Sequence, residues 1–240
     1  MHAEEYDRMR RLEDAYWWFV GRRTLALGLL DDAVPERTRV LDLGCGTGAV
    51  LTALDYRRRA VGLDMSEQAL AYCRERGLSA LALGRGEQIP FCTETFDAVV
   101  ALDVFEHIED DAAALAEAWR VLRPGGALVL SVPAFMSLWG PHDVALMHFR
   151  RYRAPGLADR LREAGFSDVR VSYSVFFLFP VVWLIRLFEK RRTGPAHASL
   201  PAVPGWANRA LIGLQALEAR LIRVLRLPWG SSLVAVARKG

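Results

Sequence analysis

The sequence has few cysteines, no periodic glycine or proline, and no continuous apolar run of the length that crosses a membrane. Its three cysteines, at positions 45, 73 and 92 of 240 residues, include no CxxC pair, so neither a disulfide framework nor a structural zinc site is expected. The 19 glycines and 11 prolines follow no period, and with 52% hydrophobic residues this excludes collagen-like, low-complexity and disordered chains. The uncharged stretch 171–185 contains a proline and falls short of the about twenty residues that a spanning helix needs.

Charge is nearly balanced overall, with 31 basic and 28 acidic residues, and the net charge of +3 excludes no class of partner. The first twenty residues contain eight charged side chains, a density that signal peptides do not have. We therefore expect a cytoplasmic protein.

From residue 39 onward, short apolar runs alternate with helical patterns, which is typical of βαβ units and a parallel sheet. Helices are expected over Ser66 to Arg76, Asp111 to Leu122 and Pro155 to Ala164. The expected strands are residues 39–43, 60–64, 79–83, 97–102, 127–132, 169–174 and 232–237. The predicted fold class is α/β, with a doubly wound, mostly parallel, Rossmann-like sheet of seven strands whose carboxyl ends bind ligands.

Two segments lie outside this alternation. Residues 1–30 are predicted to form a helical lid, a charged helix that ends in the aromatic cluster Tyr16 to Phe19. Residues 31–240 form the main domain, in which residues 175–230 are a helical insertion before the last strand, far longer than that connection requires.

A glycine-rich turn follows the first expected strand. Gly44, Gly46 and Gly48 let a ligand approach the backbone, with main-chain N–H groups free to donate. Asp64 ends the second strand, where a carboxylate can accept from both hydroxyls of a ribose. A dinucleotide fingerprint would instead be G-x-G-x-x-G, and position 49 is alanine.

Asp42 together with these glycines resembles motif I of the class I S-adenosylmethionine methyltransferases of type 11/12. The similarity continues through residues 62–66, 88–91, 96–110 and 122–126, so it spans residues 39–133 in the family's order and spacing. This resemblance implies an enzyme, a methyltransferase that uses S-adenosyl-L-methionine and releases S-adenosyl-L-homocysteine.

The resemblance also implies roles for single residues. Asp42, Gly44 and Gly46 would surround the methionine part of the cofactor, Asp64 would hold the ribose, and Met65 would pack on the adenine. Many relatives have an aspartate before the proline that matches Pro90, but this chain has Arg85 and Gly86 there, with Glu87 as the nearest acid. The full set of expected cofactor contacts is Asp42, Gly44, Cys45, Gly46, Asp64, Met65, Gly86, Glu87, Leu102 and Arg22.

Three of the five histidines follow expected strand ends and are the candidate catalytic residues: His107, His142 and His148. Methyl transfer from a sulfonium requires alignment and exclusion of water, and a base only when the acceptor must lose a proton early. Neutral imidazole suits that task near pH 7. His107 either faces the transferred methyl group or orients its loop, and the sequence leaves both readings open.

The segment 142–152 resembles a subset of bacterial methyltransferases with cell-envelope and glycan functions. That likeness implies an acceptor site lined by Asp143, Arg150, Arg151 and Tyr152, with arginines suited to a phosphate or carboxylate. Surface salt bridges are the alternative use of the arginines. A metal site of His142, Asp143 and His148 has no recognised spacing, so no metal is expected.

The insertion 175–230 contains eight basic and two acidic residues, a net +6 that leaves −3 on the rest of the chain. Arg186 and the basic run 190–192 follow an aromatic and aliphatic stretch. The segment from Trp206 to Leu227 has an amphipathic helical pattern, with an apolar face of Trp206, Ala210, Leu214, Leu217, Leu221, Val224 and Leu225. We predict contact with an anionic membrane surface, peripheral to the inner face of the membrane. A cover for the sheet and a homodimer interface are the alternatives.

The expected function is therefore methyl transfer to a small, amphiphilic or lipid-linked acceptor at a membrane surface. An RNA methyltransferase and a non-catalytic cofactor-binding protein that dimerises through the insertion are the alternatives. Nucleic acid is disfavoured because the aromatic residues are not interleaved with the basic ones. Oxygen, nitrogen and carbon acceptors all occur on this scaffold, so the sequence does not select the acceptor atom.

Overall fold

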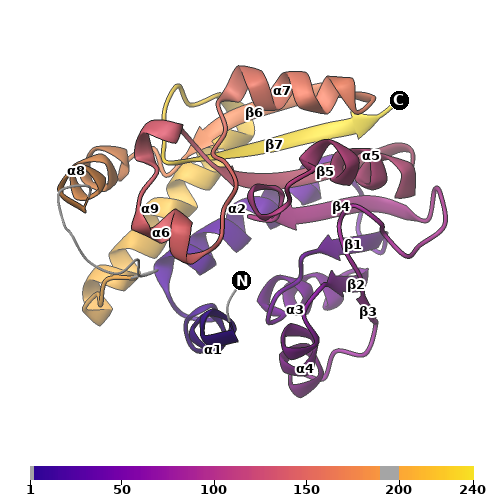
Figure 1. Cartoon of the computed structure of the whole chain (residues 1–240), viewed down its shortest axis with the longest axis horizontal. Coiled ribbons are helices and arrows are strands. Elements are labelled where there is room, and N and C mark those ends of the chain that lie inside the picture. The colour runs from indigo at the N-terminus through magenta and orange to yellow at the C-terminus, as the bar shows by residue number, and fades with distance from the viewer. Residues whose placement is uncertain (1–2, 190–199) are drawn as a thin grey trace.

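A seven-stranded sheet in the order β3-β2-β1-β4-β5-β7-β6 forms the centre of the computed structural model (Figure 1), which describes residues 3–189 and 200–240. The last strand, β7, is antiparallel to both of its neighbours, and the other pairs are parallel. The strands are β1 (Arg39–Leu43), β2 (Arg59–Asp64), β3 (Leu81–Leu83), β4 (Phe96–Leu102), β5 (Leu122–Pro133), β6 (Phe166–Ser174) and β7 (Ser232–Lys239). The predicted seven-stranded, mostly parallel sheet is thus confirmed.

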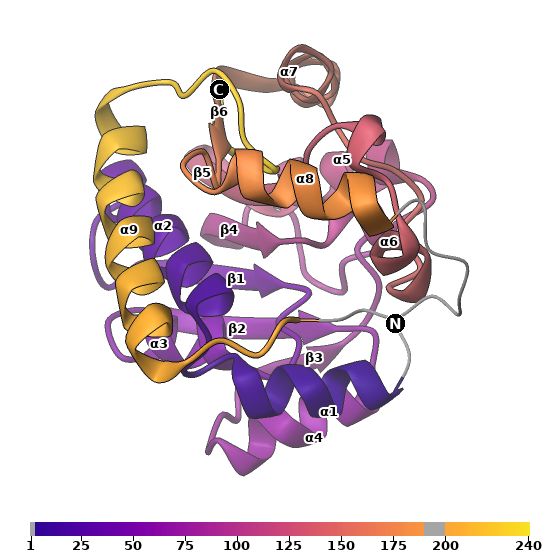
Figure 2. The same cartoon turned by 90° about the vertical axis from the view of Figure 1, so that its left-hand side faces the viewer.

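Helices cover both faces of the sheet. The described helices are α1 (Ala3–Leu12), α2 (Trp17–Ala33), α3 (Ala49–Asp55), α4 (Glu67–Glu75), α5 (Asp111–Val121), α6 (Pro141–Ala145), α7 (Ala154–Glu163), α8 (Phe179–Glu189) and α9 (Gly205–Val224), with short 3-10 turns η1 (Phe105–His107) and η2 (Met136–Leu138). Apolar side chains of α2, α3, α4 and α9 pack on one face, and those of α5 and α7 on the other. Figure 2 shows α2 and α9 side by side and α1 beside α4.

Alternation along the strands explains these three layers. Successive side chains of a strand point to opposite faces. Accordingly Val40 belongs to the core under α2 and α3, whereas Leu41 and Leu43 belong to the core under α5. All of them are buried, because both faces of a doubly wound sheet are covered.

Polar caps begin two of the helices where the sequence predicts them. The hydroxyl of Ser66 accepts from the main-chain N–H of Ala69, and the carboxylate of Asp110 accepts from that of Ala113. Strands β1, β2, β4 and β5 run parallel to one another, so their carboxyl ends lie at one edge of the sheet, where the loops that follow them meet.

The N-terminal segment and the insertion differ from the sequence interpretation. Residues 3–33 form two helices, and the aromatic cluster opens the second helix at Trp17 instead of ending the first. In α9 the buried residues are Gln215, Glu218, Ala219 and Ile222, whereas Trp206, Leu217, Val224 and Leu225 are exposed. These four exposed residues belong to the predicted apolar face and do not cover the sheet, because the helix packs on α2 along a different stripe.

The insertion lies between β6 and β7, as predicted, and contains α8 and α9. The basic residues Lys190, Arg191 and Arg192 fall outside the described residues. Within the parts of the chain that are described, no helix is both long and apolar enough to span a bilayer.

Candidate active site

The glycine-rich turn after β1 is closed by hydrogen bonds within the protein. The N–H groups of Gly44 and Cys45 both donate to the Leu63 carbonyl, and the N–H of Gly46 donates to Oδ2 of Asp64 at 2.9 Å. Gly44 has a φ of +70°, and a Cβ there would lie 2.5 Å from Cγ2 of Val104. The expectation of free donor groups is wrong for these three amides, and the turn serves to bring β1 close to β2.

Two carboxylates flank this turn. Asp64 accepts from the amides of Gly46 and Ser66, both at 2.9 Å, and burial raises its pKa. Asp42 is also buried, and among the described residues no group donates to its Oδ2. Burial, and then the neighbouring charges of Asp64 and Glu13, raise the pKa of Asp42 well above its usual range. This concentration of carboxylates favours a positively charged ligand.

Helix α1 covers the glycine turn. A Cβ on Gly46 would lie 2.7 Å from Cε of Met9, so that side chain reaches the backbone of the turn. Tyr6 is buried beside Asp64. Glu13, 5% exposed, accepts from the hydroxyl of Thr47 and lies 2.7 Å from Nη2 of Arg76. The N-terminal segment is thus anchored directly on the turn.

The other expected cofactor residues lie along the same edge. Met65 projects from the end of β2 with 62% of its surface exposed, which leaves it free to contact a flat ring. A Cβ on Gly86 would lie 2.7 Å from Cδ1 of Ile108, and Glu87 beside it is half-buried. Leu102, at the end of β4, lines a cavity together with Arg22.

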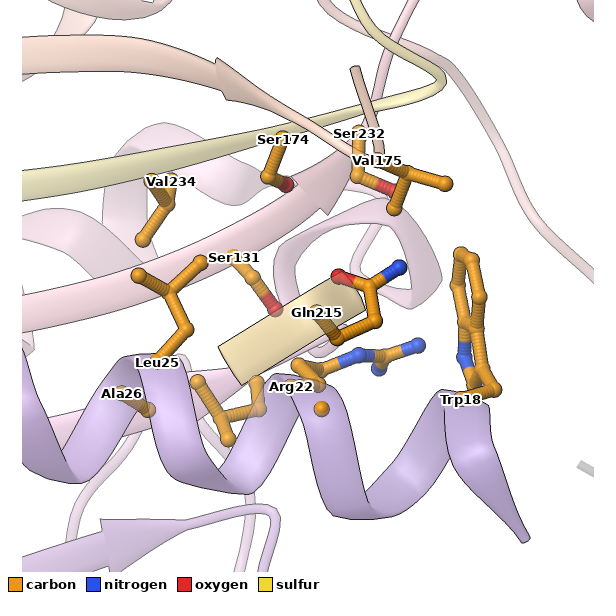
Figure 3. A pocket seen from close by; sticks show the side chains of 12 residues that line it. Trp18, Arg22, Leu25, Ala26, Ser131, Ser174, Val175, Gln215, Ser232 and Val234 are labelled. Atoms are coloured by element: carbon orange, nitrogen blue, oxygen red, sulfur yellow. The ribbon is translucent and has the colours of Figure 1, made fainter. Parts of the chain in front are cut away.

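That cavity lies between α2 and the carboxyl ends of the central strands (Figure 3). Arg22 and Trp18 reach into it from α2, opposite Ser131 of β5 and Ser174 of β6. The guanidinium of Arg22 pairs with Asp103 and lies 4.8 Å from the ring centroid of Trp18. Burial lowers the pKa of Arg22 to about 10, so it stays charged at neutral pH. The cavity holds ≈ 20 Å³, room for about one water molecule.

The structure brings the three predicted histidines together. The ring centroid of His148 lies 4.6 Å from that of His107 and 6.5 Å from that of His142. Burial lowers the pKa of both His107 and His142 to about 3, so both rings are neutral at pH 7. Glu106 lies beside them, and burial raises its pKa to about 8.

Asp143 fixes the loop that carries His148. Its Oδ1 lies 2.9 Å from Nδ1 of His148 and 2.7 Å from Nε of Arg151, and its Oδ2 accepts from the Gly140 amide at 2.9 Å. Burial alone would raise the pKa of Asp143, but hydrogen bonds from His148 and Arg151 bring it below its usual range. Asp143 and Arg151 are therefore engaged with each other.

The other two residues expected to bind the acceptor also have protein partners. Nη1 of Arg150 lies 2.7 Å from Oδ1 of Asp111, and the hydroxyl of Tyr152 donates to Oδ2 of the same carboxylate at 2.8 Å. Asp111 is buried and also pairs with Arg160. This geometry assigns Arg150 and Tyr152 to holding the loop after β5 against α5.

Sequence reasoning missed Asp103, Asp111 and Glu13. An acid directly after the fourth strand was the available signal for Asp103. The partners of Asp111 and Glu13 lie about 40 to 60 residues away in the chain, which no local pattern reveals.

Residues 41–130, which run from within β1 to within β5 and include the glycine turn, match the family described as a methyltransferase domain. The chain contains a class I S-adenosylmethionine-dependent methyltransferase domain. Over 142 residues this domain is 37% identical to a Mycolicibacterium smegmatis protein named a probable S-adenosylmethionine-dependent methyltransferase, covering 57% of this chain and 54% of that protein.

A second relative is the 2-methyl-6-phytyl-1,4-hydroquinone methyltransferase 2 of Oryza sativa subsp. japonica chloroplasts. It is 30% identical over 146 residues, which are 58% of this chain and 42% of the rice protein. The chain thus spans about half the length of these two curated relatives.

The fold extends beyond the matched residues. The structure of a SAM-dependent methyltransferase from Thermotoga maritima superposes with a TM-score of 0.64 at 20% identity, covering 99% of this chain and 96% of that one. At this identity the likeness concerns the fold of the whole chain, including the helices before β1 and after β6.

The residues at the glycine turn fit S-adenosylmethionine, the cofactor of this family. The cofactor carries a cationic sulfonium and an ammonium group, and either cation beside Asp42 would lower the raised pKa of that carboxyl and stabilise its ionised form. The unpartnered Oδ2 of Asp42 is an acceptor for such a group. The cofactor has no phosphate, which agrees with turn amides that are occupied by protein acceptors.

Proposed function

We propose that the protein transfers the methyl group of S-adenosylmethionine to a small amphiphilic acceptor at a membrane surface. The observation that carries the proposal is the shared edge of the sheet. The carboxylates around the glycine turn lie at the ends of β1 and β2, and the histidine cluster lies at the ends of β4 and β5. A methyl donor bound at the first group has the second group on its acceptor side.

The chemistry needs little covalent participation by the protein. When bound, S-adenosylmethionine would supply a methyl group on a cationic sulfur, and its transfer to the acceptor would release S-adenosylhomocysteine together with any proton that the reacting acceptor atom carries. Alignment and exclusion of water are the main contributions of the protein. We assign residues 1–30 to this task as a lid, because Met9 of α1 and Glu13, which directly follows that helix, contact the glycine turn.

The cofactor set retains the residues expected from the sequence, with Asp64 on the ribose, Met65 on the adenine and Asp42 on the methionine part. The candidate catalytic residues remain His107, His142 and His148, which face the acceptor. Arg22 lies between the carboxylates of the glycine turn and the histidine cluster, where it pairs with Asp103.

Exposed apolar side chains around the histidines support an amphiphilic acceptor. Four lie on η2, on α6 and on the loop after α6, and five lie on α8: Met136, Val144, Met147, Phe149, Val181, Trp183, Leu184, Ile185 and Leu187. We call these nine residues the apolar rim. Helix α8 packs beside η2, and its Arg186 is near enough to His142 to lower the pKa of that ring.

A rim of this kind matches an interfacial segment, because aromatic and aliphatic side chains enter the lipid boundary while nearby cations meet anionic headgroups. The insertion supplies the cations, with a net +6 over residues 175–230. The named substrate of the rice relative is a hydroquinone with a phytyl chain, which has the same amphiphilic character. We place the protein at the inner face of the membrane on these grounds.

Calorimetric titration with S-adenosylhomocysteine tests the first half of the proposal. We expect a dissociation constant in the micromolar range, about −8 kcal/mol. An intact, folded chain that binds no S-adenosylhomocysteine at millimolar concentration refutes it.

Flotation with anionic vesicles tests the second half. The double variant Trp183→Glu with Leu187→Glu places two charges on the apolar rim and should abolish flotation, since a charge at the lipid boundary is costly. The matched control is Tyr56→Glu, because Tyr56 is an exposed aromatic residue between α3 and β2, at the edge of the sheet opposite to the strand ends that α8 follows. If both variants float equally, or if the unmodified protein does not float, the apolar rim does not bind the membrane and α8 serves only in packing.

A further inference from the structure

Glu106, His107 and His148 form a cluster in which the proposed function gives Glu106 no task. Their candidate ligand atoms all lie within 4.8 Å of one another. Glu106 and His107 lie in η1 after β4, whereas His148 follows α6, and the Phe149 amide joins the two segments by donating to the Glu106 carbonyl at 2.7 Å. Two loops that are distant in sequence are thus fastened at the cluster.

The Glu106 side chain is buried without a hydrogen bond. The residue is 1% exposed, and within the described part of the chain neither of its carboxylate oxygens has a partner. A buried, unpartnered polar group is expensive, and a carboxylate is the most expensive kind unless a cation offsets its charge. A cation bound beside Glu106 would give this carboxylate the partner that it lacks.

Each histidine already has one ring nitrogen engaged. Nδ1 of His148 lies 2.9 Å from Oδ1 of Asp143, and His107 makes a hydrogen bond to the main chain of Leu146. Histidines that bind metals nearly always use their second nitrogen in this way, on a carboxylate or a backbone carbonyl, which fixes the tautomer and the ring orientation. Because Nδ1 of His148 is engaged by Asp143, Nε2 is the ring nitrogen of His148 that remains to bind a metal ion.

We propose that Glu106, His107 and His148 bind one divalent transition-metal ion of the zinc class. Two imidazole nitrogens and one carboxylate oxygen are a ligand set for Zn²⁺ or Fe²⁺, and three protein ligands leave a coordination position open. His142 stands outside the set, with its ring centroid 6.5 Å from that of His148. The carboxylate of Asp143 is hydrogen-bonded to His148, Arg151 and Gly140, so it orients His148 and does not bind the metal ion itself.

Zinc uptake by the tag-free full chain tests the proposal. The protein is stripped with a chelator, and Zn²⁺ binding is then measured by equilibrium dialysis with elemental analysis. The unmodified chain should bind one equivalent. Loss of a supporting residue typically weakens metal affinity by about 10–100-fold, so Asp143→Asn should fall in that range and Glu106→Gln or His107→Ala should lose at least about 100-fold. His142→Ala is the matched control and should keep the affinity of the unmodified chain.

Two further measurements distinguish a lost metal site from a misfolded chain and from a chain that has lost cofactor binding. Each variant is checked for circular dichroism and for S-adenosylhomocysteine binding, which uses the other half of the edge. Co²⁺ in place of Zn²⁺ should give visible absorption that His107→Ala changes and His142→Ala does not. The proposal is overturned if the folded, cofactor-binding chain takes up no zinc, or if Glu106→Gln and His107→Ala bind zinc as tightly as His142→Ala.

Discussion

Replacing Asp64 by asparagine is the sharpest test of the cofactor half of the site. The carboxylate is 7% exposed and each oxygen already accepts one main-chain N–H, from Gly46 on one side and Ser66 on the other. Each oxygen has a second lone pair, so the same group can also accept from the two ribose hydroxyls. Asparagine offers one oxygen and one NH₂, so one of the two main-chain donors would face another donor.

The expected loss follows from these contacts. A hydrogen bond to a charged group contributes about 1.5–3 kcal/mol, and 1.4 kcal/mol is tenfold in affinity, so losing one ribose contact weakens S-adenosylhomocysteine binding by about 10–150-fold. The misdirected NH₂ should also lower the free energy of unfolding by about 1–3 kcal/mol.

The acid side of the pH profile provides a second readout. Burial raises the pKa of Asp64 above 3.8. The ionised carboxylate is the form that accepts from the ribose, so affinity is complete above the raised pKa and falls as the pH drops through it. In Asp64→Asn this component of the acid loss should be absent.

Calorimetric titration of the two proteins at several pH values measures both effects. Asp55→Asn is the control, because Asp55 is exposed at the end of α3 and should bind the ligand normally. An Asp64→Asn chain that binds S-adenosylhomocysteine as tightly as the Asp55→Asn chain would refute the assignment of Asp64 to the ribose.

Three further predictions concern the elements that hold the site. In Gly230→Ala the new Cβ would lie 2.1 Å from the Ser174 carbonyl oxygen, and chemical denaturation should show about 3 kcal/mol of destabilisation. Glu218→Gln removes a carboxylate that accepts from the main-chain amides of residues 175–177, and the same assay should show a loss of about 1–3 kcal/mol. Glu13→Ala frees α1 from the glycine turn, so trypsin should cleave ahead of α2 about ten times faster or more.

Each of these has a contrary outcome. Gly28→Ala serves as the control for Gly230→Ala, because its Cβ would meet only Arg223 Cδ at 3.6 Å, and equal stability of the two variants would contradict the steric reasoning. An unchanged midpoint for Glu218→Gln would mean that the loop after β6 finds other acceptors. Unchanged trypsin cleavage of Glu13→Ala would show that α1 is held by its apolar contacts alone.

The sheet could be predicted from sequence because its signals are local. Each strand is a short apolar run, and the caps at Ser66 and Asp110 stand directly before the helices that they begin. The glycine turn and Asp64 could also be predicted, because the sequence between them has the length of one helix and one strand.

The packing of α9 could not be predicted in the same way. Helical periodicity selects the stripe with most apolar residues, but the structure buries Gln215 and Glu218 instead. Gly21 of α2 leaves room for Gln215, because a Cβ on Gly21 would lie 2.7 Å from Cβ of Gln215. Glu218 receives its hydrogen bonds from residues 175–177. Both causes are about 40 or more residues away in the chain, so the helix alone does not reveal them.

The positions of the apolar rim and the histidine cluster constrain how an acceptor enters. Polar groups of the site lie at the ends of β4 and β5, whereas Trp183 and Leu187 lie on α8, which packs beside η2. An acceptor that satisfies both must place its reacting polar end among the histidines and its apolar part along α8, because the reverse orientation would bury an apolar chain against Glu106 and His107. A water-soluble acceptor without an apolar part would leave the rim unused. Activity should therefore rise with the length of the apolar chain on a fixed head group, and head-group analogues of equal chemistry but no chain should be poor substrates.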